Sequence, residues 1–103
     1  MKLIKDLSAM VDEELADAKK YIKAALKHKA DNPVLAKAFY DLSTDELRHA
    51  SILQAEVTRT VDQNKGMTGE VPEAMRGVYD YLKERQLETT KAVKAYQAIF
   101  RGE

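Results

Sequence analysis

Residues 42–53 read Leu-Ser-Thr-Asp-Glu-Leu-Arg-His-Ala-Ser-Ile-Leu, and the number of helices in the chain depends on whether a helix begins here. Its Ser-Thr-Asp-Glu sequence resembles the capping box with which many helices begin. However, apolar residues continue at helical spacing from Leu35 through Leu42 to Leu53 without a change of phase. We therefore predict one continuous helix through this stretch.

Two breaks flank the predicted helix. Asn32 is a good helix N-cap and Pro33 suits the first helical position. On the other side, Gly66 and Gly69 indicate a loop, and Pro72 restarts a helix. We expect three helices, over residues of about 3–30, 33–63 and 72–100.

All three segments carry apolar residues on one face, so the sequence predicts an all-α protein of three long amphipathic helices. The first two helices should form an antiparallel hairpin, with the third beside it in one domain of residues 1–103. The apolar residues are Leu3, Ile4, Leu7, Met10, Val11, Leu15, Ala18, Tyr21, Ile22, Ala25 and Leu26; Leu35, Ala38, Phe39, Leu42, Ala50, Leu53, Val57 and Val61; and Met75, Val78, Tyr79, Leu82, Val93, Tyr96 and Phe100. Three helices of this length enclose a thin core, which dimerisation would enlarge.

Composition excludes several classes of protein. The 17 basic and 17 acidic residues give a net charge of zero, so we expect neither nucleic acid nor an anionic membrane as partner. The N-terminal stretch has no uninterrupted apolar run, so we expect no signal peptide. The chain has no cysteine, which excludes disulfides and thiolate metal sites. These features favour a cytoplasmic protein.

Three polar residues lie within the apolar stripes. Glu14 falls on the apolar arc of the first helix, and Glu46 and His49 fall in the centre of the stripe on the second. A carboxylate that faces a core costs several kcal/mol unless it is paired, protonated or bound to metal. In an antiparallel hairpin with its turn near residues 31 and 32, the three side chains lie at the same level.

Such a group suggests a metal site. Residues i and i+3 share one helix face, so Glu46 and His49 can reach the same ion. A Glu from one helix with Glu-x-x-His from the next is the ligand set for one ion of a carboxylate-bridged di-metal centre. Carboxylate and imidazole suit iron(II), manganese(II) or zinc. The alternative is a metal-free Glu/His hydrogen-bond network inside a helical-bundle interaction protein.

The sequence resembles the ferritin-like di-iron carboxylate superfamily, which includes rubrerythrins, bacterioferritins and short encapsulated ferritins. The resemblance covers residues 3–62 and rests on Glu14 and Tyr21 in EELADAKKY and on Glu46 and His49 in DELRHA. It implies that Glu14 and His49 are terminal ligands, that Glu46 bridges two ions, and that Tyr21 is a candidate catalytic residue near the metals. It also implies iron as the cofactor and oxidation of iron(II) by dioxygen or peroxide as the activity.

Full-length members of this superfamily repeat the ligand set on two further helices, and this chain does not. Its third helix has Glu84 and Glu88 but no histidine. A complete site therefore requires a second copy of the chain. We expect a homodimer, or a higher assembly of dimers, in which two hairpins form a four-helix bundle around two iron ions.

The third helix has a polar interruption at Arg85, Gln86 and Thr89. If the second and third helices pack antiparallel about a turn near residue 67, His49 lies opposite residue 85 and Glu46 opposite residue 88. One hypothesis is that this segment donates a hydrogen bond to His49 or to a ligand carboxylate. The other is that it is exposed. His28, near the end of the first helix, is expected at the surface as a partner of the helix dipole.

Overall fold

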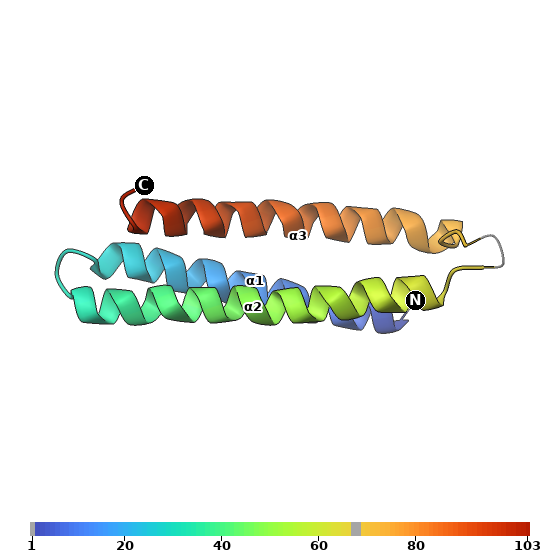
Figure 1. Cartoon of the computed structure of the whole chain (residues 1–103), viewed down its shortest axis with the longest axis horizontal. Helices are drawn as coiled ribbons and strands as arrows, with labels where there is room; N and C mark the ends of the chain where they lie inside the picture. The colour runs from blue at the N-terminus through green and yellow to red at the C-terminus, as the bar shows by residue number, and fades with distance from the viewer. Residues whose placement is uncertain (1, 67–68) are drawn as a thin grey trace.

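The protein forms three long helices in the computed structural model, which describes residues 2–66 and 69–103 (Figure 1). The helices are α1 (Lys2–His28), α2 (Pro33–Gln63) and α3 (Glu73–Phe100). No strand occurs among the described residues, so the all-α prediction is confirmed. The molecule is a rod of 58 × 20 × 15 Å, because each helix runs along nearly its whole length.

The ends of the helices follow local chemistry. Asn32 caps α2, with its side-chain oxygen accepting a hydrogen bond from the backbone N–H of Leu35 at 3.2 Å, and Pro33 takes the first helical position. The first helix ends at His28, two residues earlier than expected, in a turn at Lys29 and Ala30.

The capping-box sequence at residues 43–46 starts no new helix. Ser43 is fully buried in the middle of α2, and its hydroxyl donates to the backbone carbonyl of Tyr40 at 2.6 Å. A serine that bonds back along its own helix is compatible with helical backbone. The prediction of one continuous helix is confirmed.

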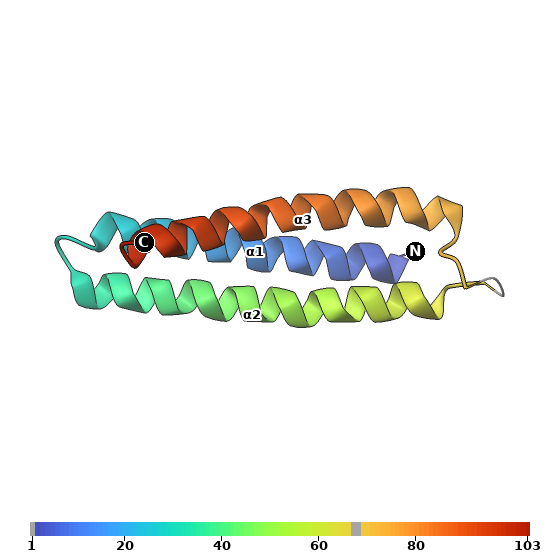
Figure 2. The same ribbon diagram turned by 45° about the horizontal axis from the view of Figure 1, so that its top comes forward.

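The two hairpins differ in how tightly they pack. Helices α1 and α2 lie antiparallel along their whole lengths, and α3 runs parallel to α1 (Figure 2). The third helix contacts α1 much more extensively than it contacts α2, although α2 precedes it in the chain. The bundle is therefore a tight α1–α2 pair with α3 docked mainly on α1.

Three apolar clusters follow one another along the rod. At one end, residues from all three helices meet: Ile4, Val57, Val61 and Met75. At the other end, Ala18, Ile22 and Ala25 of α1 pack on Val93 of α3. The central cluster comes from the first two helices alone and comprises Val11, Leu15 and Ala50.

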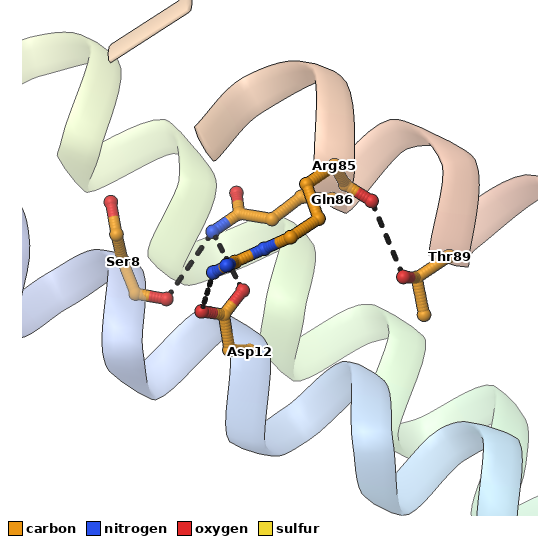
Figure 3. Close-up of polar contacts among 5 residues, drawn as sticks. All are labelled: Ser8, Asp12, Arg85, Gln86 and Thr89. Atoms are coloured by element: carbon orange, nitrogen blue, oxygen red, sulfur yellow. Dashed lines mark hydrogen bonds and ion pairs between the residues drawn. The ribbon is translucent and has the colours of Figure 1, made fainter. Parts of the chain in front are cut away.

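Polar contacts join α3 to α1 beside this central cluster (Figure 3). The side-chain amide of Gln86 donates to the backbone carbonyl of Ser8 and to the Asp12 carboxylate, both at 3.2 Å. The guanidinium of Arg85 pairs with the other oxygen of Asp12. The hydroxyl of Thr89 donates to the carbonyl of Arg85 within its own helix.

The hypothesis that this segment donates a hydrogen bond to His49 or to a ligand carboxylate is therefore wrong. Arg85 and Gln86 reach Asp12 because α3 docks on the other helix of the hairpin. The alternative of an exposed segment holds for Arg85 but not for Gln86, which is 5% exposed. None of the described helices carries an apolar stretch long enough to cross a membrane.

Candidate metal centre

The three polar residues of the apolar stripes come together between α1 and α2. One ligand atom from each of Glu14, Glu46 and His49 lies within 4.8 Å of the others. The Nδ1 atom of His49 is 3.5 Å from Oε2 of Glu14 and 3.6 Å from Oε2 of Glu46. The antiparallel pairing predicted from the turn brings about this meeting.

The three side chains are partly buried, each to a different degree. The exposed fraction is 16% for Glu46, 28% for Glu14 and 41% for His49. Each ligand-bearing helix continues for more than three turns on both sides of the group, because the group lies near the middle of α1 and of α2. Long helices hold their backbone rigidly, so the site rests on fixed elements rather than on loops.

Neither carboxylate pairs with a lysine or arginine among the residues that the structure describes. Within residues 2–66 and 69–103, His49 is the sole ion-pair partner of Glu14 and of Glu46. The chain has 17 lysine and arginine residues, so cations are not scarce. Two ionised carboxylates beside one imidazole keep a net negative charge even when His49 is protonated. A further proton or a bound cation would compensate this charge.

The two distances from Nδ1 of His49 fit ligands of a shared ion better than direct hydrogen bonds. Distances of 3.5 and 3.6 Å exceed the usual 2.7–3.2 Å between nitrogen donor and oxygen acceptor. Two ligand atoms that each lie about 2.1 Å from one ion in tetrahedral geometry are separated by about 3.4 Å. The donor set of two oxygens and one nitrogen is suited to iron(II), manganese(II) or zinc, and leaves coordination positions open.

An apolar surface surrounds the group on both helices. We call it the open face; its exposed members are Leu3, Met10, Leu35 and Leu42, and its half-buried members are Leu7, Phe39 and Leu53. They share helix faces with the ligands, since Met10 precedes Glu14 by four residues and Leu42 precedes Glu46 by four. The helix α3 docks elsewhere, through Ser8 and Asp12 of α1.

Tyr21, the candidate catalytic residue, lies on the same face of α1 two turns beyond Glu14. It is half-buried, and its ring stacks on Phe39 with 6.2 Å between ring centroids. It contributes no atom to the three-ligand group. His28, at the end of α1, stacks on Phe39 as well and lies 3.6 Å from Asp31, away from the group.

A second polar contact between helices was not anticipated from the sequence. The side-chain amide of Gln97 donates to the hydroxyls of Ser43 at 3.0 Å and Thr44 at 3.1 Å, and Gln97 is 6% exposed. The sequence does contain an indication of this contact. Gln86 and Gln97 lie eleven residues apart and share one face of α3 with the apolar residues Met75 and Val93. A glutamine in such a stripe calls for a polar partner across the interface.

Comparison with protein families, with curated proteins and with solved structures finds no match to this chain. The assignment of function therefore rests on the site itself.

Proposed function

We propose that this chain is a ferritin-like iron-binding protein in which two copies share a di-iron site. The observation that carries the proposal is the convergence of Glu14, Glu46 and His49 with no lysine or arginine paired to either carboxylate in the described parts of the chain. Glu14 and His49 would be terminal ligands and Glu46 the bridging ligand. Manganese or zinc would suit the same atoms.

The partner in this proposal is a second copy of the chain. The open face leaves Leu3 56%, Met10 49% and Leu42 40% exposed around a polar centre, and burial of such side chains is the main favourable term in association. Because the ligand group lies near the middle of the hairpin, a two-fold axis through it would superpose the whole open face on its counterpart. The same axis would bring the two ligand groups face to face.

Iron would supply redox chemistry that the protein side chains lack. Two neighbouring ions can together provide electrons for the reduction of dioxygen or peroxide, so oxidation of iron(II) is the activity that we propose. The contribution of the chain is to hold two carboxylates and an imidazole at fixed positions in a largely apolar setting. Tyr21, on the same face of α1 two turns beyond Glu14, would be a candidate participant.

The alternative is a metal-free interaction protein in which Glu46 is a structural partner of His49. The two models predict opposite effects of Glu46→Ala. If Glu46 is a metal ligand, its removal eliminates the stabilisation by metal but leaves the metal-free dimer at least as stable, since a largely buried carboxylate is lost. If Glu46 is a structural partner, its removal lowers the free energy of unfolding by about 1–3 kcal/mol with or without metal.

Thermal melts of the wild type and Glu46→Ala distinguish the models, in chelator and in anaerobic iron(II). We expect iron to stabilise the wild type by about 3 kcal/mol at a hundredfold excess over Kd, and the variant by much less. A variant destabilised in chelator, beside a wild type indifferent to iron, manganese and zinc, would exclude the metal-site model.

The direct test is elemental analysis of protein purified without added metal, together with its mass in solution. We expect one iron per chain in a dimer, and near-ultraviolet absorbance of iron(III) after oxygen is admitted to the iron(II) form. A folded monomer that binds iron with the same affinity as the dimer would contradict a shared site.

A further inference from the structure

A cavity of about 230 Å³ lies between α2 and α3. Its apolar lining comes from Val57 on α2 and from Tyr79, Leu82 and Leu87 on α3. The cavity is open to solvent on one side, where Thr58, Lys83 and Leu87 are exposed. An enclosed cavity of about 150 Å³ is enough to hold benzene, so the volume here has room for a small organic molecule.

The cavity follows from the way in which α3 docks. The third helix meets α2 at two places, near Met75 at one end and at Gln97 towards the other. Between them, Gln86 bonds to Ser8 of α1 rather than to α2, so the facing walls of α2 and α3 stay apart. Ser8 and Gln86 both border the cavity, which places α1 at its base.

Several polar groups at the cavity have no hydrogen-bond or ion-pair partner in the described parts of the chain. Among the described residues, Lys83 makes no ion pair, and the side chains of Gln54 and Thr58 make no hydrogen bond. The Lys83 ammonium lies 5.8 Å from the centroid of the Tyr79 ring, at the rim. In Figure 3 the amide oxygen of Gln86 points away from both Ser8 and Asp12. An apolar pocket with a few uncommitted polar groups is typical of a small-molecule site.

We propose that this cavity binds a small amphipathic carboxylate, with its apolar body between α2 and α3 and its carboxylate at Lys83. The apolar lining selects a hydrocarbon or aromatic body. Lys83 is the one charged side chain among the described residues that line the cavity, which selects an anionic head group. Gln54 and Thr58 add neutral donors for the same oxygens.

This proposal does not depend on the metal site. The cavity-facing residues Gln54 and Thr58 lie on a different side of α2 from His49 and Leu53, as their helical positions require. His49→Ala is therefore expected to leave ligand binding unchanged, so failure of either proposal can be recognised separately.

The test uses octanoate as the probe and octan-1-ol as its uncharged counterpart, titrated into the metal-free chain of 103 residues by calorimetry and by amide NMR. We expect one octanoate per chain, with shifts concentrated at Thr58, Tyr79 and Leu87. Lys83→Gln should weaken octanoate by about threefold to fivefold, as loss of one exposed charge pair does, and leave octan-1-ol unchanged. Lys91→Gln, which removes an exposed charge two turns further along α3, is the matched control and should change neither.

A second experiment fills the cavity with larger side chains. Thr90→Leu and Thr58→Leu add apolar volume from opposite walls, and either should weaken both probes by more than about tenfold. Absence of octanoate binding to the wild type would overturn the proposal. So would equal effects of Lys83→Gln and Lys91→Gln, or NMR shifts confined to the open face around Leu35 and Leu42.

Discussion

At the scale of single residues, neighbouring glutamates have different environments. Glu13 is exposed, whereas Glu14 is 28% exposed and converges on His49. The difference arises because consecutive residues on a helix point about 100° apart. A one-residue change of position therefore separates a surface carboxylate from a candidate ligand.

Glu14→Gln should abolish high-affinity iron binding. Changes to groups that merely support a ligand already weaken metal binding by about 10–100-fold, so loss of a ligand should cost at least about 100-fold. Iron(II) titrations under anaerobic conditions measure the affinity, and His49→Ala should behave similarly.

The matched control is Glu13→Gln, which removes the same charge from the next position. It should leave the affinity for iron within about twofold of the wild type, since an exposed charge contributes little at this range. Equal losses in the two variants would mean that the net negative charge of α1, rather than the Glu14 carboxylate, attracts the metal.

At the scale of helices, the docking of α3 depends on a polar contact. Asp12 is 37% exposed and engages both Arg85 and Gln86, each through a different carboxylate oxygen. The carboxylate thus joins two adjacent side chains of α3 to one point on α1, which determines the relative position of the two helices along the rod.

Asp12→Ala should lower the free energy of unfolding by about 1–3 kcal/mol, because Gln86 loses a partner in a buried position and Arg85 loses its ion pair. Chemical denaturation measures this difference. Asp17→Ala is the control: Asp17 is exposed on the same helix and forms no ion pair among the described residues, so its loss should change stability by less than about 0.5 kcal/mol. A neutral result for Asp12→Ala would show that apolar contacts alone position α3.

The sequence was sufficient to predict the helices and the ligand group, but not the docking of α3. The helical period and the Asn32-Pro33 turn determine which residues of α1 and α2 face one another. The proximity of Glu14, Glu46 and His49 could therefore be predicted from the sequence. A turn near residue 67 predicts only that α3 returns antiparallel to α2. It does not determine whether α3 lies over α2 or over α1, because that choice depends on which side chains find polar partners, here Gln86 with Asp12 and Ser8.

At the scale of the whole molecule, the rod has one apolar side and one side occupied by α3. The open face carries Leu3 and Leu35 towards opposite ends of the hairpin, each eleven residues from the nearest ligand in sequence. Both ends should therefore contribute to association without touching the metal.

The double variant Leu3→Glu/Leu35→Glu should be a monomer and should bind iron at least about tenfold more weakly than the wild type, since burial of an unpaired charge opposes association. Sedimentation measures the mass, and an iron titration measures the affinity. Ile99→Glu, which places the same charge at a 57% exposed position on α3, should remain dimeric. A double variant that stays dimeric would show that the copies associate through another surface.

The parallel course of α1 and α3 also places their carboxyl ends together at one end of the rod. The partial negative charges of these two helix ends outnumber the partial positive charge of the α2 N-terminus, which lies at the same end, so cations near them are stabilising. Lys27 and His28 lie in the last turn of α1, and the Lys29 ammonium donates to the carbonyl of Phe100 at the end of α3.

Lys29→Gln should lower the free energy of unfolding by about 0.3–1 kcal/mol at low ionic strength, with a smaller difference in about 1 M salt. Lys20→Gln, further from the helix end, should change neither the stability nor its dependence on salt by much. Denaturation curves at the two salt concentrations measure both quantities. They would show whether the lysines at this end compensate the partial charges of the protein's own backbone or serve to attract an external anion.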